Sequence, residues 1–137
     1  MKVLIDTNVI IDVLANREPY VEYSARFLKI CGVQVSGFIV ASQTTDIFYL
    51  LCRLGMHEHS AKDIIRKLTD NIKVAGVTVV DIQNALASDV SDYEDGLLSC
   101  CAKRLKAQYI VTRNIKDFAL SPVPALSPQM FLEKYFS

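Results

Sequence analysis

The sequence lacks an excess of basic residues, because 15 Asp and Glu side chains balance its 15 Lys and Arg side chains. Many proteins that bind nucleic acids passively are strongly basic, so this balance argues against a simple polyanion binder. It does not exclude enzymes that act on nucleic acids. Clustered carboxylates can hold metal cations while Lys and Arg elsewhere face the phosphates.

Long apolar runs are also missing, although 51% of the residues are hydrophobic. Charged residues interrupt every apolar run well before the roughly 20 residues that a membrane-spanning helix needs. The opening Met1 to Ile5 lacks the longer apolar region and the cleavage site of a secretory signal, so we expect a strand there. The sequence therefore predicts no contact with a membrane.

Cysteine and histidine sites are equally poorly supported. The cysteines form no C-x-x-C pair and are predicted to be reduced, mostly buried thiols, which favours a cytoplasmic protein. These cysteines are Cys31, Cys52, Cys100 and Cys101. His57 and His59 lack the further ligands that a zinc site requires.

The length of 137 residues suits one domain with one core. No repeat, low-complexity stretch or linker divides the chain, so a single domain over residues 1–137 is predicted. β-branched apolar runs predict strands at 2–6, 33–40, 74–80, 109–112 and 124–126. Helical spacing predicts helices at 9–14, 21–31, 42–54, 60–72, 82–87, 94–106 and 128–136, the third capped by Ser42. Strands separated by helices, without hairpin signals, predict an α/β fold with a mostly parallel central sheet covered on both faces.

Asp6 directly follows the first predicted strand. In an open parallel sheet, ligands bind beyond the carboxyl ends of the strands. Asp6, Thr7 and Asn8 also have the side chains that cap helices. Taken alone, Asp6 is as compatible with a helix cap as with a metal ligand.

Three further aspartates change this balance. Asp46 lies near the start of the helix after the second strand, and Asp92 and Asp95 begin the helix that leads to the fourth strand. Asp46 could instead favour the helix dipole, and Asp92 could be a helix cap. Carboxylates that converge at one edge repel each other unless cations compensate them, and such oxygen ligands select Mg²⁺ or Mn²⁺. Together these residues predict a metal site.

The segment from Thr112 to Phe118 adds polar side chains after the fourth strand. Thr112 can form a hydrogen bond, Arg113 can contact a phosphate, and Asn114 and Asp117 can order metal-bound water. The alternative is an ordinary polar turn anchored by Phe118.

These motifs occur in the order and spacing of the PIN-domain family, which the sequence resembles from end to end. The resemblance implies a three-layer α/β/α sandwich and an endoribonuclease that cleaves RNA with Mg²⁺ or Mn²⁺ bound by Asp6, Asp46 and Asp95. Bacterial members include the toxins of VapBC-type toxin–antitoxin pairs. The resemblance therefore also implies a toxin with an antitoxin partner, and a homodimer.

Two departures from the family accompany this resemblance. Many members have Glu at the position of Asp46, and an acid is frequent at the position of Asn114. Within the implied mechanism, one metal activates water for in-line attack on phosphorus and a second cation stabilises the leaving oxygen. The outer shell would contain Asp92, Asn114 and Asp117. The residues that position the substrate and the loop would be Thr7, Asn8, Thr112 and Arg113.

Three alternatives remain open. A degenerate PIN-like module would bind RNA or a partner without cutting. A receiver-type signalling domain could use Asp81 as its phosphoacceptor, but the opening strand lacks an acidic pair. A HAD-like phosphatase needs a second acid two residues after Asp6, where the sequence has Asn8.

Overall fold

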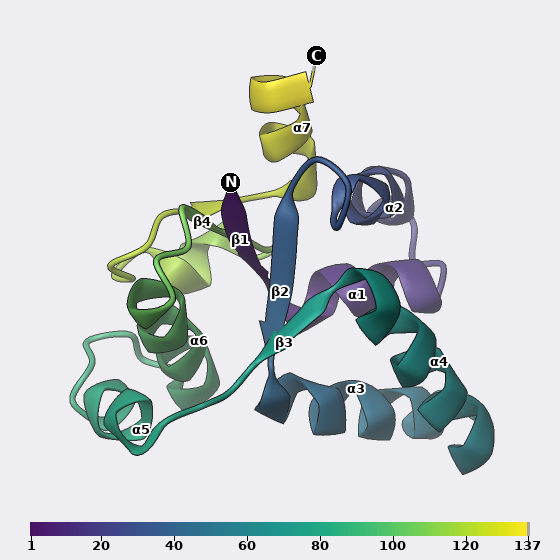
Figure 1. The fold of residues 1–137 in the computed structure, drawn as a ribbon, viewed down its shortest axis with the longest axis horizontal. Helices are drawn as coiled ribbons and strands as arrows, with labels where there is room; N and C mark the ends of the chain where they lie inside the picture. Colours follow the sequence, from purple (N-terminus) through teal and green to yellow (C-terminus); the bar gives the residue numbers. More distant parts are fainter. Residues whose placement is uncertain (137) are drawn as a thin grey trace.

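The computed structural model describes residues 1–136, so the last residue of the predicted domain lies outside the described residues. Two α-helices follow each of the first three strands along the chain (Figure 1). The strands are β1 (Lys2–Ile5), β2 (Ser36–Val40), β3 (Lys73–Ala75), β4 (Tyr109–Val111) and β5 (Ala125–Leu126). The α-helices are α1 (Thr7–Leu14), α2 (Val21–Ile30), α3 (Ala41–Arg53), α4 (Glu58–Asn71), α5 (Val79–Leu86), α6 (Tyr93–Arg104) and α7 (Pro128–Phe136). A short 3₁₀ helix, η1 (Ile115–Phe118), follows β4.

The five strands form one sheet in the order β3-β2-β1-β4-β5. Every neighbouring pair is parallel, and in the centre Val3 lies opposite Gly37 on one side and Tyr109 on the other. Parallel neighbours need long crossovers, and the intervening helices supply them. The predicted parallel α/β fold is confirmed, and β1 at the centre places the residue that follows it in the middle of one sheet edge.

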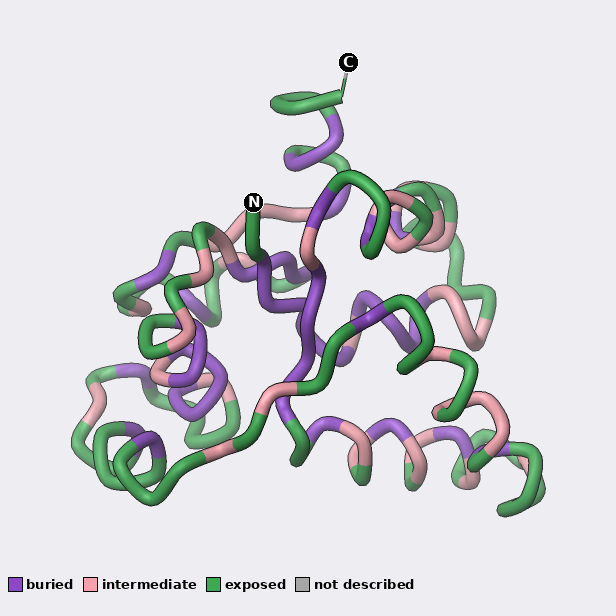
Figure 2. The backbone as a smooth tube through the Cα atoms, in the orientation of Figure 1, coloured by how far each residue is buried: buried purple, intermediate pink, exposed green. Residues whose placement is uncertain are grey.

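Both faces of the sheet are buried, as the central strands in Figure 2 show. Side chains alternate between the faces of a strand. Ile5 accordingly joins the core cluster that includes residues of α1, α2, α3 and α7, whereas Leu4 joins the cluster that includes residues of α5 and α6. The chain is therefore a three-layer α/β/α sandwich with one core on each side of the sheet.

The prediction of a third strand over residues 74–80 is wrong beyond Ala75. β3 ends at Ala75, and α5 begins at Val79, so the β-branched pair Val79 and Val80 lies in a helix with both side chains exposed. Thr78 caps this helix: its hydroxyl accepts from the Asp81 N–H, and the Asp81 carboxylate accepts from the Thr78 N–H. This reciprocal capping satisfies two backbone donors and outweighs the β-propensity of the valines.

The predicted cap at Ser42 is also wrong. α3 begins one residue earlier, directly after β2, and Ser42 is an exposed residue within the helix. The buried Gln43 performs the capping instead, because its Oε1 accepts a 2.8 Å hydrogen bond from the Val40 N–H.

The thiol prediction is confirmed for the core. All four cysteines are free, with Cys31 and Cys101 buried and the other two half-buried. Burial raises the pKa of both buried thiols to about 12, so they behave as small apolar side chains. Among the described residues, no helix has the length and apolar character needed to cross a membrane.

Candidate active site

Asp6 lies where β1 ends and α1 begins. It is the N-cap of α1, and its Oδ1 accepts a 2.8 Å hydrogen bond from the Thr7 N–H. The side chain is nevertheless turned toward the edge of the sheet, because Oδ2 accepts from the Thr112 hydroxyl at 2.8 Å and from Asn8 Nδ2 at 3.1 Å. The interpretation of Asp6 as a helix cap is therefore confirmed, while its other oxygen faces the neighbouring strand end and its role as a metal ligand stays a prediction.

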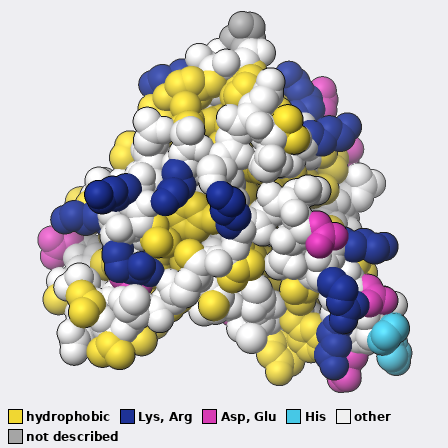
Figure 3. Space-filling view, in the orientation of Figure 1, with side chains coloured by type: hydrophobic (Ala, Val, Ile, Leu, Met, Phe, Trp, Pro, Cys, Tyr) yellow, Lys and Arg dark blue, Asp and Glu magenta, His cyan; other side chains and the backbone are white. Residues whose placement is uncertain are grey.

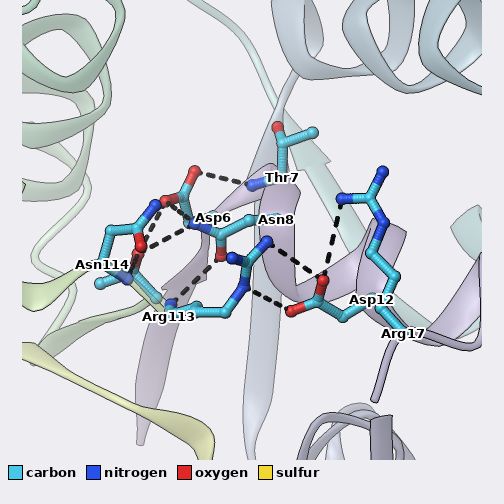
Figure 4. A network of polar contacts seen from close by, with 8 residues as sticks. Asp6, Thr7, Asn8, Asp12, Arg17, Arg113 and Asn114 are labelled. Atoms are coloured by element: carbon cyan, nitrogen blue, oxygen red, sulfur yellow. Dashed lines mark hydrogen bonds and ion pairs between the residues drawn. The ribbon is translucent and has the colours of Figure 1, made fainter. Parts of the chain in front are cut away.

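Residues after β4 complete this arrangement (Figure 4). Thr112 Oγ accepts from the Asn114 N–H at 3.0 Å, and Asn8 Oδ1 accepts from the Arg113 N–H at 3.2 Å. These bonds tie the loop after β4 to the start of α1. Three of the predicted site residues, Asn8, Thr112 and Asn114, thus meet around Asp6.

Gln43 fixes the same edge from the other side and was missed at the level of sequence. Its Nε2 donates to the Ile5 carbonyl at 2.8 Å and to the Thr7 hydroxyl at 3.2 Å. Together with the bond from Val40, one buried amide joins the ends of β1 and β2 to both following helices. The Thr7 hydroxyl therefore has a structural partner, although it was predicted to face substrate.

A cavity of about 320 Å³ opens at this edge, and most of its polar lining is acidic. Asp6 contributes from the end of β1, and three acids come from the start of α6. Asp92 caps α6 by accepting from the Asp95 N–H at 3.0 Å, as its alternative reading required, yet it also lines the cavity. The acidic lining residues are Asp6, Asp92, Glu94, Asp95 and Asp117. The structure therefore brings together predicted residues from three separate segments.

The proximity of these groups changes their protonation. Burial, reinforced by the charges of Asp6 and Asp92 among others, raises the pKa of Asp95 to about 7. Burial also raises the pKa of Asp6, although the hydrogen bonds from Thr112 and Thr7 act in the opposite direction. Raised pKa values of neighbouring carboxyl groups are a frequent property of functional sites.

Glu94 is a member of this cluster that was quoted as part of a motif but not predicted as a site residue. Its pKa is raised first by burial and then by the charge of Asp46 and a hydrogen bond to it. Asp46 is half-buried on α3 and is not among the residues that line the cavity. Asp46 therefore joins the acidic group through Glu94, and the pair supplies two carboxylates where the sequence suggested one.

Arg113 binds a carboxylate of the chain itself, whereas the sequence predicted that it contacts a phosphate. Its Nε and Nη2 donate to the two carboxylate oxygens of Asp12 at 2.8 and 3.2 Å, and its guanidinium lies 4.4 Å from the centre of the Tyr20 ring. Asp12 is fully buried in α1, and Arg17 approaches it at 4.0 Å (Figure 4). Sequence reasoning missed Asp12, although an acid within the apolar stretch of α1 needs a partner.

The chemistry of the site suits a hard divalent cation. All of its acidic donors are carboxylate oxygens, which Mg²⁺ and Mn²⁺ prefer. A cation would offset both the burial and the neighbouring negative charges that raise the pKa of Asp95. Among the described residues, no three Asp, Glu, His or Cys side chains are already grouped closely enough to bind an ion. Mg²⁺ usually keeps several water ligands when it binds to carboxylates.

The residues of two alternative sites have other roles. Asp81 is buried at the start of α5, and both of its oxygens accept from Arg104 Nε at 3.0 Å. His57 caps α4, and His59 lies 3.5 Å from Asp63. The geometry supports neither a phosphoacceptor at Asp81 nor a zinc site.

Comparison with known families agrees with this geometry. A family model described as PIN domain matches residues 2–116, which include β1, the acidic start of α6 and most of the loop after β4. The chain belongs to the PIN-domain family. Among curated proteins, none matches the sequence.

Solved structures with the same fold come from bacterial toxin–antitoxin systems. VapBC2 from Rickettsia felis, bound to promoter DNA, matches with a TM-score of 0.72 at 12% identity, over 93% of this chain and 98% of that one. VapBC-1 from Haemophilus influenzae matches with a TM-score of 0.70 at 16% identity, over 94% and 99% of the two chains. VapC20 from Mycobacterium tuberculosis, described as a toxin that cleaves the sarcin-ricin loop, matches with a TM-score of 0.66 at 14% identity, over 89% and 98%. At these identities the likeness establishes the fold.

Proposed function

We propose that the chain is an endoribonuclease that hydrolyses RNA phosphodiester bonds with Mg²⁺ or Mn²⁺. The observation that carries the proposal is the acidic cavity itself. Carboxyl groups from β1, α6 and the loop after β4 surround one space of about 320 Å³ in a PIN-domain chain. Their mutual repulsion is costly in the absence of a ligand, and a bound cation would remove that cost.

The residues divide into two groups. Asp6, Asp46 and Asp95 would hold the cation, with Glu94 beside Asp46 as a further oxygen donor. A cation held there would supply an activated water for attack on phosphorus. Asp92, Asn114 and Asp117 surround these ligands, and the hydroxyl of Thr112 and the amide of Asn8 hold the Asp6 carboxylate in orientation.

The proposal extends to the biological setting. Several neighbours of known structure are toxin–antitoxin complexes, which supports a toxin that an antitoxin protein inhibits by covering the acidic cavity. We also propose that the chain forms a homodimer, as the family resemblance implies. The free thiols favour the reducing conditions of the cytoplasm.

Metal-dependent cleavage by matched variants tests the activity. We expect Mg²⁺ or Mn²⁺ to support cleavage of an RNA pool and EDTA to abolish it. Asp6→Asn and Asp95→Asn should each lower the rate at least about a hundredfold, as loss of a group that stabilises charge in the transition state does. Asp70→Asn, which removes an exposed carboxylate on α4, is the control and should leave the rate unchanged. Cleavage that survives both active-site substitutions would show that the activity lies elsewhere.

The second candidate is a PIN-like module that binds RNA or a partner without cutting. It is favoured by the absence, among the described residues, of a preformed group of three metal-binding side chains. Titration with Mn²⁺ distinguishes the two functions. Weak Mn²⁺ binding without cleavage of any RNA tested would favour the binding module.

A further inference from the structure

The arginines that border the acidic cavity have little charge to offer a phosphate. Arg113 shares both oxygens of Asp12, and Arg17, which lines the cavity, approaches the same carboxylate. The cavity itself is acidic and repels a polyanion. If the chain acts on RNA, as proposed above, cations outside the cavity lining add to its attraction for phosphates, and the exposed Lys116 of η1 is one of them.

A basic groove lies beside β3, between the start of β1 and the end of α6. Lys2 and Lys73 line a cavity of about 200 Å³ whose other walls are Ser36, Phe38, Val74, Ala75 and Leu105. Lys106 is exposed and directly follows Leu105 in the chain. We call Lys2, Lys73, Arg104 and Lys106 the basic groove. Figure 3 shows Lys and Arg side chains around a hydrophobic patch on this face of the molecule.

Specific contacts hold the basic groove together. Lys2 Nζ donates a 3.1 Å hydrogen bond to the Leu105 carbonyl at the end of α6, which places one ammonium group across the groove. Arg104 Nη2 donates to the Gly76 carbonyl at 2.7 Å, next to the end of β3. The groove is therefore built from the start of β1, the edge strand β3 and the end of α6.

The charge of the basic groove is mostly uncompensated. Arg104 forms an ion pair with the buried Asp81. No ion pair within residues 1–136 involves Lys2, Lys73 or Lys106. By contrast, α4 mixes its basic residues with acids, and Arg66 on that helix is paired with Asp63. Three neighbouring lysines without counter-charges form a surface that attracts phosphates.

We propose that the basic groove binds the RNA backbone beside the cleavage site. Phe38 lies opposite Leu4 on one side and Lys73 on the other, so Lys73 is two residues short of Asp6 along the strands and two strands away across the sheet. At roughly 3.3 Å per residue and about 4.8 Å per strand, this is a separation of about 12 Å. A helical strand spaced like duplex DNA, with a phosphate about every 3.4 Å of axis, covers such a distance with about four phosphates. An RNA strand that runs over the surface from the acidic cavity to the groove can thus contact both.

RNA affinity measured without cleavage tests this proposal separately from the nuclease activity. In the Asp6→Asn background with EDTA, a labelled single-stranded RNA of mixed sequence is titrated at several salt concentrations. The groove variant is Lys2→Gln, Lys73→Gln and Lys106→Gln combined. The control removes the same net charge with Lys29→Gln, Lys62→Gln and Lys67→Gln, which are exposed lysines on α2 and α4. Thermal unfolding verifies that both triple variants are folded. Lys73→Gln alone is a second, milder groove variant, because Lys73 forms no ion pair within the described residues.

The groove variant should bind RNA at least about tenfold more weakly at low salt, and its salt slope should fall by about 2, at 0.7 per lost phosphate contact on a single strand. The control should retain the slope of the parent. An unchanged slope in the groove variant, or an equal loss in the control, would overturn the proposal. The proposal would also be overturned if the groove variant bound RNA normally but no longer bound an antitoxin protein, because the groove would then be a protein-binding surface. RNA binding that depends on the groove in a chain that never cleaves RNA would instead contradict the nuclease function alone.

Discussion

The hydroxyl of Thr112 donates a 2.8 Å hydrogen bond to Asp6 Oδ2, joining residues 106 positions apart at the ends of β4 and β1. Both side chains are buried, and Thr112 is fully so. This bond helps to orient the carboxylate and lowers its pKa against the effect of burial. A neutral neighbour therefore favours the ionised form of the Asp6 carboxyl group.

Thr112→Val should expose this dependence. Valine keeps the shape of threonine but leaves a buried carboxylate oxygen without its strongest donor, which costs about 1–3 kcal/mol of unfolding free energy. The pKa of Asp6 should rise further, and RNA cleavage at neutral pH should fall. Urea unfolding and cleavage rates measure the two effects. Thr112→Ser keeps the hydroxyl and is the control, so equal losses in both variants would rule out the hydrogen bond as the cause.

The stability of the metal-free protein should fall as the pH rises from about 4 to about 7, as measured by thermal unfolding in EDTA. The sign follows from Asp95, whose pKa of about 7 in the folded state lies above its ordinary value of 3.8. The folded state then binds the proton more tightly than the unfolded state. Its stability is greatest below the ordinary pKa and decreases until the pH passes the folded pKa.

Asp95→Asn should remove part of this pH dependence and raise the melting temperature of the metal-free protein at pH 8, while it abolishes cleavage. Asn cannot carry the charge that the neighbouring acids repel, and stabilisation with loss of activity is typical of a strained functional site. Asp70→Asn should leave the pH profile unchanged. A lower melting temperature for Asp95→Asn at pH 8 would contradict the repulsion argued for this site.

Gln43→Ala should destabilise the fold by about 2–3 kcal/mol, because it removes the partners of buried backbone groups at Val40 and Ile5. Cleavage should fall too, since the ends of β1 and β2 lose their link. Chemical denaturation measures the first effect. The exposed Gln83 on α5 provides the control, and a Gln43 variant no less stable than Gln83→Ala would refute this role.

Arg104→Met should cost about 3–5 kcal/mol, because it leaves the buried Asp81 carboxylate without its cation. Burial raises the pKa of Asp81, but the hydrogen bonds from Arg104 and Thr78 outweigh it and lower the pKa overall. This stabilisation is present above the ordinary pKa of 3.8 and is lost as the pH falls through the lower folded value. In an acid titration, the difference in stability between the parent and Arg104→Met should therefore disappear below about pH 4. A difference that persists at lower pH would speak against the ion pair.

The sequence by itself determined the order of the elements and the class of the fold. Local signals were sufficient for β1, α2, α6 and α7, because apolar periodicity and caps act within a few residues. They failed at Val79 and Val80, where a capping interaction between Thr78 and Asp81 outweighed β-propensity. Asp6, Asp92 and Asp95 were also recognised from sequence, because strand ends and helix starts are local features.

Only the tertiary structure decided how the polar side chains pair. Nothing local connects Asp12 with Arg113, Gln43 with Ile5, or Glu94 with Asp46, because each pair joins segments that meet only after the sheet has formed. Arg113, which the sequence predicted to contact a phosphate, pairs with Asp12. The packing of α6 against the sheet brings acids from separate segments into one cavity. Side-chain type and spacing could identify Asp6 as a candidate. Its partners follow from the parallel sheet, which brings strand ends from distant parts of the chain to one edge.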